Sequence, residues 1–238
     1  MKIALIGYGK MGKAIEEIAI QRGHEIVLRV GIENLEENTI ENIQRADVAI
    51  EFTGPEIAYD NVTRCLNAGV PVVCGSTGWL DKIEEAKKLV EKTNGAFLYA
   101  SNFSVGVNIF FAINTKLAEL TAPYKEYKPA IKEIHHTQKK DAPSGTAITL
   151  AEQILATHPS QTKWVNHDSV HPEELQILSE RIDPAPGTHV VTYQSAIDDI
   201  EITHTAHSRK GFALGAVLAA EFLHDKKGIF SMKDVLKL

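Results

Sequence analysis

The amino-terminal residues combine a short apolar run, a glycine-rich turn and a helical pattern, and this order most restricts the fold. Residues 2–6 form the apolar run, Gly7-Tyr8-Gly9-Lys10-Met11-Gly12 forms the turn, and the helical pattern continues to about Arg22. Between a strand and a helix, a GxGxxG sequence is typical of a dinucleotide-binding unit, because its glycines allow a tight turn and let a pyrophosphate approach the helix N-terminus. We therefore predict cofactor contacts at Gly7, Gly9, Lys10, Met11 and Gly12.

The same turn nearly matches a second motif, the phosphate loop GxxxxGK[ST]. Gly7, Gly12 and Lys13 fit that motif, but the next residue is Ala14. Alanine lacks the hydroxyl that would hold magnesium, so the sequence disfavours a nucleoside-triphosphate site.

Strand patterns alternate with helical patterns as far as residue 104. Strands are predicted at 25–30, 47–52, 69–74 and 96–100, with helical stretches after the second and third of these. This order predicts a parallel sheet whose ligand lies outside the carboxyl ends of the strands. Turns that fall on this edge contain Gly54, Gly75–Gly78 and Ser101–Ser104.

An acidic residue follows the second strand where a ribose is expected. Glu33 lies 21 residues after Gly12, close to the spacing of about 20 at which a carboxylate meets the ribose 2′-hydroxyl. A carboxylate repels a 2′-phosphate, which favours NADH as the cofactor, with NADPH as the alternative because Lys10 could offset the repulsion. Glu36 and Glu37 lie in the same loop, so the pattern fits a solvated acid at position 33 equally well.

The run from Glu133 to Thr146 concentrates reactive and anion-binding groups. It reads Glu-Ile-His-His-Thr-Gln-Lys-Lys-Asp-Ala-Pro-Ser-Gly-Thr, and the charge of its histidines can change near neutral pH. Ser144 is a good N-cap, and Gly145 lets a ligand approach the backbone, so the following helix start suits a carboxylate or a phosphate. Taken by itself, Ser-Gly-Thr would be explained by an ordinary capped helix after a lysine-rich turn. The histidines and lysines immediately before it favour an active site.

The second half of the chain indicates another domain. An apolar helical pattern covers 105–122, and a strand at 130–136 and a helix at 147–156 follow. A polar stretch at 158–172 is predicted to be a loop. Strands are then predicted at 175–182, 188–195 and 200–206, and they should be antiparallel because no helices separate them.

These patterns predict an α/β chain with two domains. A Rossmann-type dinucleotide-binding domain is expected over 1–104, completed by 208–238, where the apolar helix 212–223 should return to the first sheet. An α+β domain is expected over 105–207, with an open mixed or antiparallel sheet, and the resemblance described below implies that this domain serves substrate binding and oligomerisation. Such an open sheet usually needs covering by another surface.

The composition limits the class of protein. The chain has 238 residues, of which 44% are hydrophobic, and a formal net charge of −6. Proteins that bind nucleic acids or membrane surfaces usually carry a basic excess, so we predict neither partner. No apolar run reaches the length of about 18 residues that a membrane span needs, and residues 1–7 lack a signal-peptide pattern, which indicates a cytoplasmic protein. Cys65 and Cys74 should accordingly be buried and reduced.

Four histidines raise the question of a metal site. His135 is adjacent to His136, and His204 is near His207, but neighbouring residues of a strand point to opposite faces. These pairs are therefore poor ligand pairs, and no cysteine or carboxylate spacing completes a tetrahedral set. We predict no metal.

The sequence His-His-Thr-Gln-Lys-Lys-Asp-Ala-Pro-Ser-Gly-Thr resembles the signature of the 4-hydroxy-tetrahydrodipicolinate reductase (dihydrodipicolinate reductase) family. That signature has paired histidines, a lysine four residues after the first, and Asp-Ala-Pro-Ser-Gly-Thr. The segments at 51–56, 75–78 and 101–108 are similar to further motifs of the family. Residues 184–191 differ from the family's Gly-x-x-Val-Gly-Glu-His, so the resemblance assigns no role to His189.

The resemblance implies an NAD(P)H-dependent reductase of lysine (diaminopimelate) biosynthesis. Its substrate is a cyclic imine with two carboxylates, and its open sheets cover one another in a homotetramer. By position, His135 and Lys139 are the proton-donating pair. The residues that would bind the substrate carboxylates are His136, Lys140, Ser144, Gly145 and Thr146. The residues that would contact the nicotinamide half are Gly75, Ser76, Thr77, Ser101, Asn102 and Phe103.

Two alternatives use the same scaffold. One is a different nicotinamide enzyme, such as an amino-acid dehydrogenase, because a fold does not fix a reaction. The other is a protein that binds NADH and signals through its oligomer. A sensor needs no proton donor, so His135 with Lys139 favours the enzyme.

Overall fold

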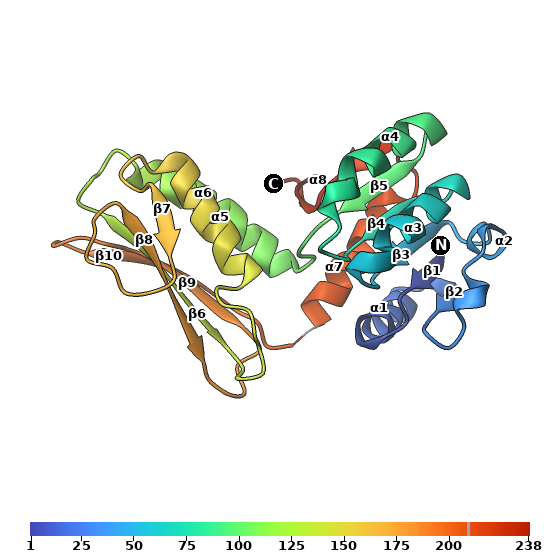
Figure 1. The fold of residues 1–238 in the computed structure, drawn as a ribbon, viewed down its shortest axis with the longest axis horizontal. Coiled ribbons are helices and arrows are strands. Elements are labelled where there is room, and N and C mark those ends of the chain that lie inside the picture. Colours follow the sequence, from blue (N-terminus) through green and yellow to red (C-terminus); the bar gives the residue numbers. More distant parts are fainter. Residues whose placement is uncertain (209) are drawn as a thin grey trace. The chain divides into compact units, whose positions relative to one another are not determined.

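The computed structural model describes residues 1–208 and 210–238, and the chain divides into two compact units (Figure 1). The first unit comprises Met1–Val105 together with Lys210–Leu238, and the second comprises Gly106–Arg209. Within the described residues, no helix combines the length and apolarity needed to cross a membrane.

The first unit contains a six-stranded sheet in which every neighbouring pair is parallel, as the alternation of strands and helices predicts. The strand order is β11-β5-β4-β3-β1-β2. The strands are β1 (Lys2–Ile6), β2 (Glu25–Val30), β3 (Val48–Glu51), β4 (Val72–Cys74), β5 (Ala96–Tyr99) and β11 (Gly228–Phe230). Strand β11 was not predicted from the sequence, because three residues are too few to show an alternation.

Helices cover both faces of this sheet. Successive residues of a strand point to opposite sides, and apolar residues on both sides pack against helices. Ile3 and Leu5 pack with one set of helices, and Ala4 and Ile6 pack with the other. The first set is α1 (Lys10–Gln21), α7 (Lys210–Leu223) and α8 (Met232–Leu236). The second set is α2 (Ile40–Ile43), α3 (Pro55–Asn67) and α4 (Ile83–Thr93), and the short 3-10 helices are η1 (Leu35–Glu37) and η2 (Leu80–Lys82). The predicted return of the helix at 212–223 to the first sheet is confirmed by the packing of α7.

The second unit contains a five-stranded mixed sheet in the order β10-β9-β6-β8-β7. Its strands are β6 (Lys128–His135), β7 (Lys163–Val165), β8 (Glu174–Arg181), β9 (Thr188–Gln194) and β10 (Asp199–Thr205). β6 is parallel to β8 and antiparallel to β9, so β8 and β9 lie on either side of β6 and do not pair with each other. The prediction of three antiparallel strands in succession was therefore right only for β9 and β10.

One face of the second sheet carries the apolar core of this unit. Helices α5 (Val105–Thr121) and α6 (Gly145–Thr157) pack there against Ile131, Ile177 and Tyr193. Among the described residues, no helix of the unit packs on the other face, where Lys132 pairs with Glu180 at 2.8 Å.

The expectation of a loop over 158–172 was partly wrong. Lys163–Val165 forms β7, which pairs with β8 in parallel register. Only three residues pair, and the surrounding stretch is polar, so no strand pattern is visible in the sequence. The loop prediction holds for the segments before and after β7.

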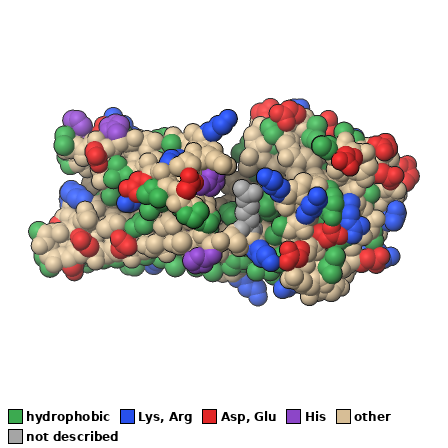
Figure 2. Space-filling view, turned by 90° about the horizontal axis from the view of Figure 1, so that it is seen from below, with side chains coloured by type: hydrophobic (Ala, Val, Ile, Leu, Met, Phe, Trp, Pro, Cys, Tyr) green, Lys and Arg blue, Asp and Glu red, His purple; other side chains and the backbone are tan. Residues whose placement is uncertain are grey.

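The surface carries both signs of charge. On the face drawn in Figure 2, acidic and basic side chains are interspersed over the first unit. This face therefore lacks the continuous basic surface that is typical of nucleic-acid binding.

Candidate active site

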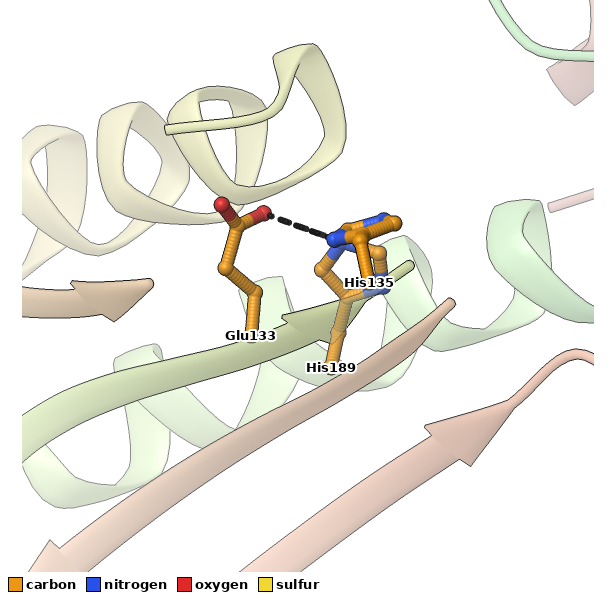
Figure 3. Close-up of side chains that lie close together, drawn as sticks. All are labelled: Glu133, His135 and His189. Carbon is orange, nitrogen blue, oxygen red and sulfur yellow. Dashed lines mark ion pairs between the residues drawn. The ribbon is translucent and has the colours of Figure 1, made fainter. Parts of the chain in front are cut away.

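Three buried polar side chains meet on the helix-covered face of the second sheet (Figure 3). Glu133 and His135 lie two residues apart on β6, so their side chains share a face. His189 on β9 is the register partner of Glu133 and reaches the same face. The ring centroids of His135 and His189 are 5.0 Å apart, and the rings meet edge to face.

Glu133 is the centre of this cluster, and its side chain is fully buried. The backbone N–H of Ser144 donates to both carboxylate oxygens at 3.1 Å, and the guanidinium of Arg181 lies 3.4 Å from Oε1. Burial alone would raise the pKa of Glu133, but its interactions with His189 and Ser144 outweigh burial and place the pKa below the ordinary range. Glu133 is therefore a carboxylate at neutral pH.

His135 is neutral at the same pH. Burial is the main cause that lowers its pKa to about 4, and the nearby His189, Lys139 and Arg181 lower it further. Glu133 acts in the opposite direction, with Oε2 located 3.6 Å from Nδ1 of His135. The ring thus needs additional negative charge nearby before it holds a second proton at neutral pH.

The segment after β6 carries Lys139 and is tied to β8 by Arg181. Nη2 of Arg181 donates to the carbonyl of Asp141 at 2.6 Å, and Nε donates to the carbonyl of Lys139 at 3.3 Å. Nζ of Lys139 donates to both carboxylate oxygens of Asp141, at 2.9 and 2.8 Å, and this contact lowers the pKa of Asp141. Lys139 therefore lies close to the histidine cluster with its ammonium group paired to a local acid.

Helix α6 begins at the cluster, one residue after its cap. Oγ of Ser144 accepts the backbone N–H of Ala147 at 3.2 Å, as expected for the predicted N-cap, and lies 3.1 Å from Nε2 of His189. Apart from the neighbouring residues and the backbone of its own helix, no atom of the described residues lies within 4 Å of the position where a Cβ on Gly145 would be. A ligand can therefore approach the helix N-terminus at Gly145, which suits a carboxylate.

The predicted substrate-binding residues differ in exposure. Ser144 is buried, His136 and Thr146 are half-buried, and Gly145 and Lys140 are exposed. All five lie within the segment between β6 and the first turn of α6.

Glu133, Arg181 and His189 were not predicted from the sequence to take part in the site. The two-residue spacing of Glu133 and His135 was a usable signal, because alternation along a strand places both on one face. Arg181 and His189 come from strands on either side of β6, and only the strand order brings them to the cluster.

Glu133, His135 and His189 also offer ligand atoms that all lie within 4.8 Å of one another, an arrangement that could hold a metal ion. This set differs from the histidine pairs that the sequence analysis considered. Both oxygens of Glu133 already accept the Ser144 N–H, and the guanidinium of Arg181 lies 3.4 Å from one of them. A cation in this position would be repelled by Arg181, so the trio fits a carboxylate–imidazole cluster better than a metal centre.

The first unit contains a cavity of ≈ 730 Å³ at the carboxyl ends of β1, β2 and β3. Its lining includes Gly7, Gly9, Lys13 and Glu33. Gly7 has a φ of 102°, and a Cβ there would lie 2.0 Å from the carbonyl oxygen of Phe52, so this turn requires glycine. The cavity lies where a parallel sheet is expected to hold a dinucleotide.

The remaining predicted cofactor residues occupy the same unit. Lys10, Met11 and Gly12 form the start of α1, with Lys10 exposed and Gly12 buried. Residues 75–77 follow β4, where the buried Ser76 accepts the backbone N–H of Thr53 at 2.8 Å. Residues 101–103 follow β5, and the side chain of Phe103 is in the core, 5.4 Å from the ring of Phe52.

Comparisons with known proteins cover nearly the whole chain. Family models described as the N-terminus and the C-terminus of dihydrodipicolinate reductase match residues 1–103 and 106–236. A 4-hydroxy-tetrahydrodipicolinate reductase of Christiangramia forsetii is 53% identical over 238 residues, which are 99% of this chain and 98% of that protein. The protein of the same name from Methanosarcina barkeri is 37% identical over 214 residues, covering 87% and 78%.

A solved structure agrees at the level of the fold. Dihydrodipicolinate reductase from Paenisporosarcina sp. TG-14, with dipicolinate bound, superimposes with a TM-score of 0.77 at 23% identity over 97% of each chain. The similarity of sequence and fold over both units means that this chain belongs to the dihydrodipicolinate reductase family.

Proposed function

We propose that the two units divide the reaction of this family between them. That reaction is the reduction of 4-hydroxy-tetrahydrodipicolinate to tetrahydrodipicolinate with NAD(P)H in lysine (diaminopimelate) biosynthesis, and the chain is an oxidoreductase of this kind. The dinucleotide-binding domain is 1–104 with 208–238, and the substrate-binding domain is 105–207. These bounds lie within two residues of the compact units. The proposal is carried by the buried cluster of Glu133, His135 and His189 beside an accessible helix start.

The substrate is a cyclic dicarboxylate, and the second unit offers positive groups for its carboxylates. The Paenisporosarcina relative was solved with dipicolinate bound. In this chain, the opening at Gly145 gives a carboxylate access to the N-terminus of α6, and Thr146 belongs to the same turn. His136 and Lys140 lie in the segment that precedes this helix, where they can donate hydrogen bonds to a carboxylate. Because the Ser144 N–H is already directed at Glu133, Ser144 contributes mainly by fixing the helix start.

His135 and Lys139 form the pair that donates a proton to the substrate. NAD(P)H, when bound, supplies the hydride. His135 is neutral in this structure because it is buried, and two substrate carboxylates nearby raise its pKa so that it enters the reaction protonated. When the substrate binds, Lys139 leaves Asp141 and pairs with a substrate carboxylate. This contact holds the substrate ring beside His135.

NADH is the preferred cofactor, and NADPH is the alternative. Glu33 lines the cavity of the first unit, where its charge would repel a 2′-phosphate. β2, the strand before Glu33, also carries Arg29. Nε of Arg29 donates to Glu16 at 2.9 Å, so this guanidinium is already paired with an acid of the chain. Lys13 lines the cavity and can approach a pyrophosphate or a 2′-phosphate.

The protein is proposed to be a cytoplasmic homotetramer. Among the described residues, one face of the second sheet lacks a covering helix, which supports assembly through that face. Cys65 and Cys74 are buried free thiols, as suits a reducing compartment.

NADH oxidation by the purified chain tests the activity. We expect oxidation with the cyclic imine and none with a panel of 2-oxo acids supplied together with ammonia. Turnover with a member of the panel alone would indicate an amino-acid dehydrogenase. NADH binding without turnover on any substrate would indicate a sensor and refute the enzyme proposal.

A further inference from the structure

The carboxylate of Glu133 has no role in the reaction as described so far, although it is the centre of the cluster. Both oxygens accept the Ser144 N–H at 3.1 Å, and these contacts fix the carboxylate against the start of α6. The side chain is fully buried and ionised. A fixed carboxylate beside an imidazole orients the ring and stabilises its charged form.

The two nitrogens of His135 have different surroundings. Nδ1 is buried and has no hydrogen-bond partner among the described residues, and Oε2 of Glu133 lies 3.6 Å away. Nε2 lies beside Gly187, where a Cβ would come within 3.1 Å of it, so a larger residue at 187 would crowd this nitrogen. Catalytic contacts of this kind are often long before the substrate binds and shorten in the complex. The surroundings therefore pair Nδ1 with the carboxylate and leave Nε2 for proton exchange.

We propose that Glu133 is the positioning residue of the proton donor: its carboxylate accepts the Nδ1–H of His135 and makes Nε2 the nitrogen that gives a proton to the substrate. The inference rests on the proposed role of His135. In this step the N–H bond at Nε2 breaks and its electron pair stays on the ring. The proton bonds to the substrate atom that holds the electron pair released when hydride arrives. Glu133 stays ionised, and His135 regains its proton from water.

The groups that face the pair come from every neighbouring element. They are His189 on β9, Ser179 and Arg181 on β8, and Lys139 and Ser144 in the segment between β6 and α6. His189, Lys139 and Arg181 all oppose a charge on His135, and Glu133 is the group of this set that favours it. Nε2 of His189 lies 3.1 Å from Oγ of Ser144 and 3.7 Å from Oε2 of Glu133, so His189 contacts the same carboxylate oxygen as His135 but has Ser144 as its nearer partner.

Nitrogen NMR of the intact wild-type protein tests the tautomer directly. At neutral pH, the ring of His135 should carry its hydrogen on Nδ1, with the signal assigned by its loss in His135→Asn. A hydrogen on Nε2 instead would overturn the proposal. This measurement does not depend on whether a Glu133 variant folds.

Glu133→Gln tests the charge, because glutamine keeps an oxygen for the Ser144 N–H. We expect kcat to fall by at least about tenfold, with KM for NADH changed by less than about twofold, because general acid catalysis contributes about 10²–10⁴-fold. The limb of the kcat–pH profile that reports His135 should move to lower pH. Glu152→Gln on the exposed side of α6 is the matched control and should keep wild-type kcat.

A double-mutant cycle separates positioning from a merely structural effect. If Glu133 acts through His135, Glu133→Gln should lower kcat by less than about twofold in a His135→Asn background. Equal losses in both backgrounds, or wild-type kcat in Glu133→Gln, would overturn the positioning role alone. Full turnover in His135→Asn would instead refute the proposed proton donor, and with it this inference.

Discussion

Replacing Arg181 with methionine should destabilise the second unit and loosen the segment that carries Lys139. Methionine keeps the apolar stem but removes the guanidinium, which lies 3.4 Å from the buried Glu133 and donates to the Asp141 carbonyl at 2.6 Å. A lost hydrogen bond from a charged group costs about 1.5–3 kcal/mol, and an unpaired buried charge costs about 3–5 kcal/mol. Ser144 and His189 still hold Glu133, so the charge is only partly uncompensated. We therefore expect a loss of about 3 kcal/mol.

Urea unfolding followed by tryptophan fluorescence measures this loss. Trp164 on β7 pairs in register with Leu175 on β8, the strand that carries Arg181, so its emission reports the second unit. A Trp164→Phe variant identifies the part of the signal that comes from Trp79 in the first unit. Lys132→Met is the matched control, because the Lys132–Glu180 pair is largely exposed and such pairs contribute at most about 1 kcal/mol. Amide exchange over residues 137–141 should also become faster in Arg181→Met. A loss below about 1 kcal/mol with unchanged exchange would refute the view that Arg181 holds this segment.

Three further changes test the site. Lys139→Ala should remove most of the turnover and leave NADH affinity nearly intact, because Lys139 belongs to the second unit; collapse of NADH binding with normal turnover per bound cofactor would contradict its role. Glu33→Ala should weaken NADH more than NADPH, measured by fluorescence titration, and equal losses would show that Glu33 does not touch the ribose. Acidification should destabilise the wild type through His135: its folded pKa of about 4 lies below the ordinary 6.5, so the unfolded chain binds the proton first. This contribution is complete above pH 6.5 and is lost as the pH falls toward 4, on the order of 3 kcal/mol, and His135→Asn should flatten that part of the stability–pH curve.

The first unit follows from local signals in the sequence. The apolar run at Lys2–Ile6 and the turn at Gly7 indicate a strand that enters a helix, and helices between strands require parallel pairing. The two-sided core then follows from the burial of nearly every residue of β1 and β3. Strand β11 was not predicted, because its three residues pair only through contacts with β5 that are distant in the sequence.

The candidate site was predicted only in part. The Ser144 cap and the neighbourhood of His135 and Lys139 are local features, and the structure has Ser144 in the predicted capping position. The contacts of Lys139 with Asp141 and of Arg181 with Asp141 depend on how the segment between β6 and α6 folds back. No pattern of apolar and polar residues encodes that path, because most of the segment is exposed.

The strand order β9-β6-β8 explains why the site assembles where it does. His189 is the register partner of Glu133, and Arg181 is the register partner of His135, so each neighbour of β6 delivers one basic group to the same face. A slip of one residue in either pairing would turn that strand's side chains to the opposite face and separate the basic group from Glu133. The apolar residues Ile131, Ile177 and Val191 fix the same registers from within the core. The core and the polar cluster therefore select one pairing of these strands, and a change that weakens the register should affect stability and proton transfer together.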